Sequence, residues 1–347
     1  MIRKTIFVLL IFETVSLFSC FKQNEKEISR GVYFWKTTFN LSPSEINWLK
    51  ETAIKKLYIR FFDVDWNPGL SSAVPVGDVA IESKNINNVD IIPVVFITNR
   101  TLLNISDSAI SRLSFNIHDK ICSKFRNFTN QTLKEIQLDC DWTETTRDKY
   151  FSLIEQIKKL SLSEHVEITA TIRLHQVKYY RMTGVPPIKR GTLMFYNMTD
   201  VSDIKTRNSI FDIDAAKKYL VNFKEYPIDL DVVLPAFSWA CWFRNEKLKN
   251  LINDIKAKDL RSNKNFIQED KYIFRALKEY SLKGNYILKG DYIRTEETGF
   301  TTTYNAAELI APYIKNKRIN VSIYHLNNEI IKNYGPDKFK DIVDCFN

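Results

Sequence analysis

The chain has 347 residues, of which 44% are hydrophobic and 26% are charged, and its formal net charge is +9. A chain of this length and apolar content can bury one large core. The basic residues are scattered along the expected helices, and no nucleic-acid-binding motif accompanies them. The charge therefore indicates a solvated surface and argues against a nucleic acid as the partner.

The first twenty residues have the pattern of an export signal. A basic start precedes an apolar run at residues 5–18, which is short for a transmembrane helix. The run leads into Leu17-Phe-Ser-Cys20, which resembles a bacterial lipobox and implies cleavage before Cys20 and a lipid on its sulfur. An ordinary signal peptide with an incidental cysteine is the alternative. We expect an exported protein anchored to a membrane of the bacterial cell envelope, the outer membrane, with residues 21–30 as a flexible tether.

Eight strand-like runs alternate with helical stretches. Most of the runs are nearly continuous in apolar residues, as parallel strands buried on both faces should be. The alternation predicts an α/β fold, a (β/α)8 TIM barrel in residues 31–347. A doubly wound open sheet is the competing fold, but the chain has only nine glycines and no glycine-rich phosphate loop. The expected strands are Gly31–Trp35, Lys56–Phe62, Ile91–Thr98, Glu135–Asp141, Glu167–His175, Thr192–Met198, Leu230–Trp239 and Ile319–His325.

The segments between these runs carry helix signals. Ser42-Pro-Ser-Glu45 is typical of a helix start, with serine at the cap, proline at the first position and glutamate three residues after the cap. The connection at residues 241–303 is too long for a simple loop and predicts a small insertion after the seventh strand, at about 245–303, with a hairpin around Lys289-Gly-Asp291. Further helices are expected at residues 104–125, 149–159, 215–223, 245–256 and 306–314.

The cysteines show no CxxC or Cys/His spacing, so the sequence predicts no zinc site and no other metal or cofactor. Cys140 and Cys241 lie in strand-like runs and are expected to be buried thiols. A disulfide between Cys122 and Cys345 is left open.

The run from Glu135 to Asp141 alternates strictly and ends in carboxylates. Its apolar residues point one way, whereas Gln137, Asp139 and Asp141 point the other. Acids on one face of a strand are costly unless that face serves a site. A strand that ends in carboxylates before an amphipathic helix is typical of the catalytic mouth of a barrel enzyme. A surface-edge strand with solvated acids is the alternative.

Aromatic and polar residues collect at the expected carboxyl ends of the strands, and five of the six tryptophans lie there. Indole faces combined with carboxylates and amides suit sugar rings, so we expect a glycan as ligand. Alternatively, the tryptophans fill the core at the barrel rim. The candidate binding residues are Trp35, Asp63, Trp66, Trp142, Arg173, His175, Gln176, Trp239, Trp242, Tyr324 and His325.

Three motifs resemble family 18 glycoside hydrolases, the chitinase-like barrels. Asp139-Cys-Asp141-Trp-Thr-Glu144 resembles the end of their DxxDxDxE signature, and Met194-Phe-Tyr196-Asn197 is similar to their Met-x-Tyr-Asp. Leu234-Pro-Ala-Phe-Ser-Trp239 is similar to their Gly-x-Pro-Phe-Tyr-Gly, and the long insertion after strand seven also occurs in that family. The chain as a whole is similar to lipoproteins of Bacteroidetes-type bacteria.

The chain departs from the family pattern at three positions. Thr143 stands where the family has its acid glutamate, Ile136 replaces the first aspartate, and Asn197 replaces an aspartate. Glu144 or Asp141 is therefore the candidate acid, with Asp139 orienting its neighbour or raising its pKa. The resemblance implies that the nucleophile is the acetamido oxygen of the substrate, held by Tyr196 and Asn197.

The leading hypothesis is a lipid-anchored, monomeric glycoside hydrolase. A glycan-binding lipoprotein without catalysis is the first alternative. A metal-dependent hydrolase that uses Asp139, His175 and His325 is the second, and it would need these three donors close together.

Overall fold

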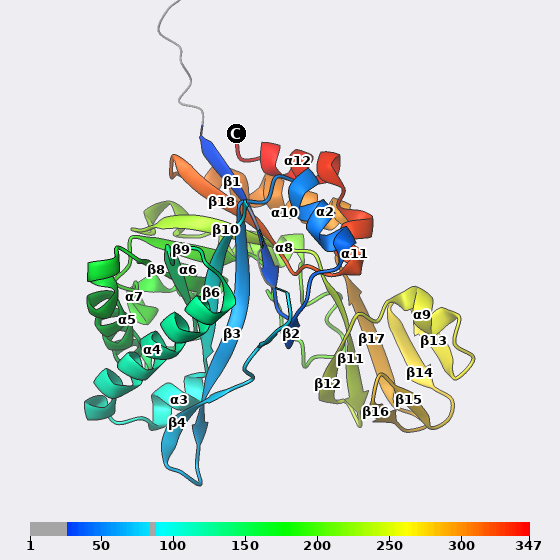
Figure 1. Ribbon diagram of the computed structural model, residues 1–347. Helices are drawn as coiled ribbons and strands as arrows, with labels where there is room; N and C mark the ends of the chain where they lie inside the picture. Colours follow the sequence, from blue (N-terminus) through cyan, green and yellow to red (C-terminus); the bar gives the residue numbers. More distant parts are fainter. Residues whose placement is uncertain (1–25, 84–85, 87) are drawn as a thin grey trace, which may run out of the picture.

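Eight parallel strands close into a barrel in the computed structural model, which describes residues 26–83, 86 and 88–347 (Figure 1). Each strand pairs in parallel with its neighbours along the chain, and the first strand pairs with both the last and the second, which completes the ring. The predicted (β/α)8 barrel is confirmed. Its strands are β1 (Glu27–Phe34), β3 (Lys56–Asn67), β6 (Asp90–Ile97), β7 (Glu135–Asp139), β8 (Glu167–Arg173), β9 (Arg190–Met194), β10 (Asp229–Pro235) and β18 (Arg318–Tyr324).

The helices lie outside this ring. The predicted helix start at Ser42 is confirmed, because its side chain accepts from the Glu45 amide and the Glu45 carboxylate accepts from the Ser42 amide. None of the helices in the described residues has the length and apolar character needed to cross a membrane. The helices of the barrel are α2 (Pro43–Glu51), α3 (Asn99–Asn104), α4 (Ile110–Phe128), α5 (Arg147–Ser161), α6 (Leu174–Lys178), α7 (Tyr180–Thr183), α8 (Ile213–Tyr219), α10 (Phe300–Ile310), α11 (Asn328–Asn333) and α12 (Pro336–Asp344), with 3-10 turns at 107–109, 162–164, 223–225 and 311–313.

Two of the barrel strands extend well beyond their expected bounds. β1 begins at Glu27, inside the expected tether, because residues 27–30 pair in register with residues 318–321 of β18. β3 runs five residues beyond Phe62 and pairs with β4 (Ser72–Val76) in a hairpin that projects from the barrel mouth (Figure 1). Two short strands, β2 (Thr38–Phe39) and β5 (Ala80–Ile81), pair with each other beside it.

The insertion after the seventh barrel strand is an antiparallel sheet with its own small core, which includes Phe274 and Ile293 (Figure 1). The expected strand 230–239 divides, because the chain leaves the barrel after Pro235 and starts a new strand at Ser238. The insertion contains β11 (Ser238–Arg244), β12 (Lys247–Asn253), α9 (Ala257–Arg261), β13 (Phe266–Asp270), β14 (Ile273–Ala276), β15 (Tyr280–Leu282), β16 (Asn285–Ile287) and β17 (Tyr292–Glu297).

Two details of the insertion were predicted wrongly. The segment 245–256 forms β12 instead of a helix, because Asn245 and Glu246 both have positive φ and form a two-residue turn that folds β12 back onto β11. The chain does turn near Gly290, whose φ is +88°. However, the strands on the two sides of that turn pair elsewhere, β16 with β15 and β17 with β11 and β14.

The inward face of β7 is polar along its whole length. Glu135 bonds to Thr169 and forms an ion pair with Lys56, and Gln137 accepts from the Tyr33 hydroxyl at 2.6 Å. Asp139 follows at the carboxyl end of the strand. The outward residues Ile136 and Leu138 are fully buried in the main core, as the alternation predicted. Polar side chains of β7 therefore line the inside of the barrel up to its mouth.

The four cysteines within the described residues are all free. Cys140 and Cys241 are buried thiols, as predicted. Cys122 and Cys345 are both free, so the disulfide left open between them does not form. Cys20 lies outside the described residues.

Candidate functional site

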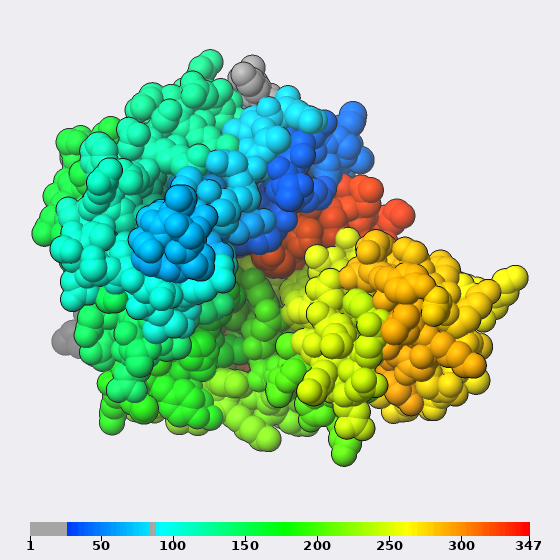
Figure 2. Space-filling model, turned by 90° about the horizontal axis from the view of Figure 1, so that it is seen from below, coloured from blue at the N-terminus to red at the C-terminus, as the bar shows by residue number. Residues whose placement is uncertain are grey.

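A cavity of about 460 Å³ opens at the carboxyl ends of the barrel strands, next to the insertion. Figure 2 views this end of the molecule, and its surface is hollowed between the barrel and the insertion, which is coloured yellow to orange. The volume is in the usual range of small-molecule pockets. The lining residues are Trp35, Lys36, Phe96, Asp139, Asp141, Arg173, Met194, Tyr196, Asn197, Phe237, Ser238, Trp239, Asn253, Asp254, Tyr324 and His325.

Two carboxyl groups and one guanidinium meet in this cavity. Asp139 accepts a hydrogen bond from the Thr171 hydroxyl at 2.5 Å and lies 3.4 Å from Nη2 of Arg173, while Asp141 forms an ion pair with Nε of the same arginine. The Asp139 side chain is 6% exposed and that of Asp141 is 52% exposed. Asp141 is therefore the acid at the mouth, and Asp139 lies beneath it.

Burial raises the pKa of Asp139; Arg173 opposes this shift, and the charge of Asp141 adds to it. Burial acts to lower the pKa of Arg173, but the two carboxylates more than offset it, so the guanidinium stays charged. With both acids ionised, the three groups carry one excess negative charge.

Tyr196 and Asn197 face the acids from the end of β9. The Tyr196 ring is buried, burial raises its pKa, and its hydroxyl donates to the Met194 sulfur at 3.2 Å. Because a thioether is a weak acceptor, a ligand oxygen can compete for this donor. Asn197 has a φ of +57° and is exposed at the cavity.

Aromatic rings form the remaining walls. Trp35 and Tyr324 lie 5.8 Å apart between ring centroids, and Phe237 contacts Trp239 edge-to-face at 5.3 Å. The Trp239 indole donates to Glu296 at 2.8 Å, which fixes its orientation. The site thus combines ring faces with carboxyl, amide and hydroxyl groups, the mixture that sugars require.

His325 lies at the same wall. Burial lowers its pKa to about 4, so the imidazole is neutral at pH 7. Its Nδ1 is buried and has no hydrogen-bond partner within the described part of the chain.

Three of the predicted tryptophans lie away from the cavity. Trp142 is fully buried, donates to the Thr183 carbonyl at 2.9 Å and stacks on Tyr150, so the prediction that it binds sugar is wrong. Trp242 donates to Asp291 in the insertion. Trp66 lies on the β3–β4 hairpin beside a separate depression of about 710 Å³.

Four other predicted residues do not line the cavity. Gln176 is buried and bonds to the backbone at Trp142 and Arg173, which gives it a structural role. Asp63 forms an ion pair with Arg60. Glu144 is exposed in the turn before α5, so of the two candidate acids only Asp141 reaches the cavity. His175 is only partly buried at the start of α6.

The metal-dependent alternative lacks a donor cluster. Across residues 26–83, 86 and 88–347, no three His, Cys, Asp or Glu side chains are grouped as metal ligands would be. Of its three proposed ligands, Asp139 and His325 line the cavity and His175 does not.

Several lining residues were not predicted. Lys36 directly follows Trp35, which was a predicted binding residue, so the sequence had already placed this strand end at the site. Asn253 and Asp254 come from the end of β12, in a segment whose apolar spacing looked helical. Neither residue carried a signal that could have placed it at the mouth.

No protein-family model and no curated protein sequence matches this chain. Its structure is similar to the spore cortex-lytic enzyme SleL of Bacillus megaterium (TM-score 0.53, 14% identity, 93% of this chain and 75% of that one). It is also similar to a mutant class V chitinase from Nicotiana tobaccum in complex with NAG4 (0.51, 11%, 91% and 98%), and to the chitinase-like agglutinin RobpsCRA of Robinia pseudoacacia (0.52, 12%, 91% and 99%). At these identities the similarity shows the fold alone, which is that of the chitinase-like (β/α)8 barrels.

Proposed function

We propose that the protein hydrolyses a glycosidic bond in an aminosugar-containing glycan bound in the cavity. The observation that carries this proposal is the carboxyl pair Asp139 and Asp141 at the mouth of an aromatic-lined cavity in a chitinase-like barrel. The class V chitinase in complex with NAG4 supports a glycan of this class. Rings on Trp35, Tyr324 and Trp239 would stack on sugar faces.

In this mechanism Asp141 donates a proton to the leaving glycosidic oxygen as the bond to the anomeric carbon breaks. Asp139 lies beneath Asp141 and contacts the same arginine, so it helps to orient the acid. The acetamido oxygen of the substrate forms the new bond to the anomeric carbon, and the Tyr196 hydroxyl and the Asn197 amide hold that group. Water then attacks the same carbon, the bond from that carbon to the acetamido oxygen breaks, and the attacking water gives a proton back to Asp141.

Glycan binding without hydrolysis is the second candidate function, and one observation favours it. Arg173 contacts both carboxyl groups, so the cation that organises the pair also competes with its use as an acid. The similarity to a chitinase-like agglutinin is consistent with this reading.

A panel of neutral and aminosugar-containing oligosaccharides separates the two candidates when affinity and cleavage are measured independently. We expect the wild-type protein to bind and cleave at least one aminosugar oligosaccharide. Tight binding with no cleavage across the panel would favour the binding protein, and no binding at all would exclude both functions for this cavity.

We also propose that Cys20 carries a lipid that anchors the protein to a membrane of the cell envelope. The support is the lipobox-like sequence Leu17-Phe-Ser-Cys20, because stable anchoring needs more than one acyl chain and the diacylglycerol that a lipobox implies supplies two. Cys20→Ser should move the protein from the membrane to the soluble fraction and abolish labelling with palmitate. Labelling that persists in this variant would contradict the proposal.

A further inference from the structure

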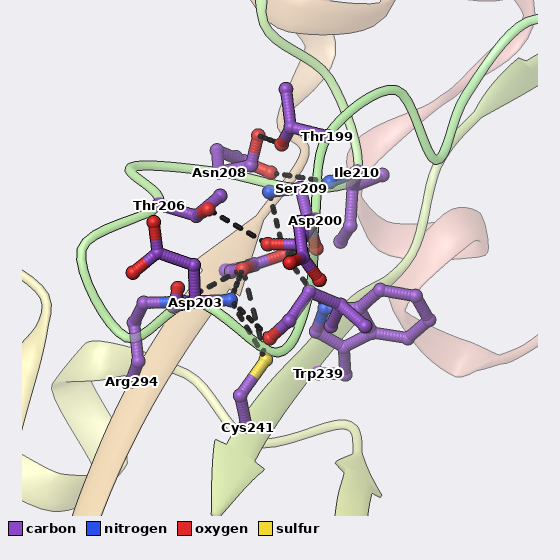
Figure 3. Close-up of polar contacts among 12 residues, drawn as sticks. Thr199, Asp200, Asp203, Thr206, Asn208, Ser209, Ile210, Trp239, Cys241 and Arg294 are labelled. Carbon is purple, nitrogen blue, oxygen red and sulfur yellow. Dashed lines mark hydrogen bonds and ion pairs between the residues drawn. The ribbon is translucent and has the colours of Figure 1, made fainter. Parts of the chain in front are cut away.

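One buried ion pair connects the insertion to the loop that follows β9. Arg294 and Glu296 lie two residues apart on β17, and their side chains are 1% and 0% exposed. Nε of Arg294 donates to Oε1 of Glu296 at 2.9 Å, and Nη2 donates to the same oxygen at 2.5 Å. The guanidinium also donates to the backbone carbonyls of Val201 and Asp203, so it holds the β9 loop as well (Figure 3).

The second oxygen of Glu296 serves two different parts of the molecule. Oε2 accepts from the amide of Ser209 at 2.9 Å, from the hydroxyl of Ser209 at 2.6 Å and from the Trp239 indole at 2.8 Å. Trp239 lies directly opposite Glu296 across the β11–β17 ladder. Figure 3 shows Arg294, Ser209 and Trp239 gathered around this point from three separate segments.

The loop held in this way includes a second wall of the cavity. The Met198 amide donates to the Ser209 carbonyl at 2.9 Å, and the Asn197 amide donates to the Ile210 carbonyl at 2.8 Å. Asn197 lines the cavity, as Trp239 does. A single carboxylate is therefore hydrogen-bonded both to the Trp239 indole and to the loop that carries Asn197.

We infer that Glu296 is a positioning residue that holds Trp239 and the Asn197 loop in the arrangement that binds the glycan. This inference rests on the proposed function. A buried ion pair is weak evidence for a role in stability, because a protein in which well-packed apolar residues replace such a pair is often equally stable or more stable. The Glu296 carboxylate accepts hydrogen bonds from Ser209 and from Trp239, and these directional bonds fix the positions of both residues in a way that apolar packing would not.

The insertion contains a matched control. Asp291 accepts from the Trp242 indole at 2.8 Å and from Nη2 of Arg244 at 2.8 Å, so it repeats the combination of carboxylate, arginine and indole. Asp291 is 3% exposed, and neither it nor Trp242 lines the cavity. Asp291→Asn therefore reproduces the loss of a buried charge without touching the glycan site.

The test compares Glu296→Gln, Glu296→Ala and Asp291→Asn, with an N-acetylglucosamine tetrasaccharide as the probe. Glutamine keeps the volume but places a donor NH2 against donor groups, since a carboxylate only accepts. We expect Glu296→Gln to weaken the affinity roughly tenfold, on the scale of losing an aromatic stack. Asp291→Asn should leave the affinity unchanged. If Glu296→Ala does not fold, Glu296→Gln alone decides the comparison.

A double-mutant cycle separates positioning from a general structural effect. If Glu296 acts partly through Trp239, then Glu296→Gln should weaken binding by a smaller factor in a Trp239→Ala background than in the wild type, whereas independent effects add in full. Additive losses, or an equal loss in Asp291→Asn, would overturn the inference.

A measurement without ligand keeps this inference separate from the proposed function. Glu296→Gln should speed amide hydrogen exchange at residues 197–211 and increase acrylamide quenching of Trp239, read against matched Trp239→Phe proteins. A wild-type protein that binds no tetrasaccharide would count against the proposed function, while the exchange and quenching would still decide the positioning role. Unchanged exchange and quenching in Glu296→Gln would overturn it.

Discussion

Asp141→Asn should reduce hydrolysis of the cleaved oligosaccharide by about 10²-fold or more, the usual scale of general acid–base assistance. Asparagine keeps the size of the side chain but removes the proton that the leaving oxygen must receive. Its affinity for the same oligosaccharide should change little, because a group that acts in the transition state contributes little to ground-state binding. Cleavage rate and affinity are measured on the same sugar.

Glu144→Gln is the matched control for this prediction. Glu144 lies three residues further along the chain and is exposed outside the cavity, so its substitution should leave both cleavage and affinity at wild-type levels. Loss of cleavage in Glu144→Gln with none in Asp141→Asn would move the chemistry to the loop before α5. Unchanged cleavage in both variants would exclude Asp141 and Glu144 as the acid.

The barrel could be predicted from the sequence because its strands carry local signals. Ile136 and Leu138 alternate with Gln137 and Asp139, and that period of two determines which side chains enter the barrel. In a barrel, the carboxyl ends of all the strands meet at one face, so reading the strand ends also brought Trp35, Asp141 and Tyr324 to one cavity.

The insertion could not be predicted in the same way. Leu248, Leu251, Ile252 and Ile255 have the spacing of a helix, but the turn at Asn245 and Glu246 requires two positive φ angles and starts a strand. The pairing of β12 with β11 then places Asn253 at the cavity. The pairing of β12 with β11 fixed this part of the site, and the apolar spacing of the segment does not encode that pairing.

The environment of a single tryptophan side chain could not be predicted from the sequence either. Trp142 and Trp239 both come shortly after the carboxyl ends of barrel strands, β7 and β10. Whether an indole faces a ligand or the core depends on what covers it, and α5 covers Trp142 with Tyr150 and Phe151. Trp239 lies on β11, which leaves the barrel, so one side of its ring stays open to the cavity.

Trp142→Ala should lower the free energy of unfolding by about 3–5 kcal/mol, the range for removing a large buried aromatic side chain. The change removes a fully buried ring, its stack on Tyr150 at 5.2 Å and its hydrogen bond to the Thr183 carbonyl at 2.9 Å. Trp239→Ala should cost clearly less stability, because its ring is partly exposed, and should weaken glycan binding instead. Urea unfolding of both variants gives the stabilities, and affinities are read at a temperature where each remains folded. Trp142→Phe keeps a ring against Tyr150 and should recover much of the loss. If Trp142→Ala were as stable as wild type and bound glycan poorly, the indole would lie at the ligand rather than beneath α5.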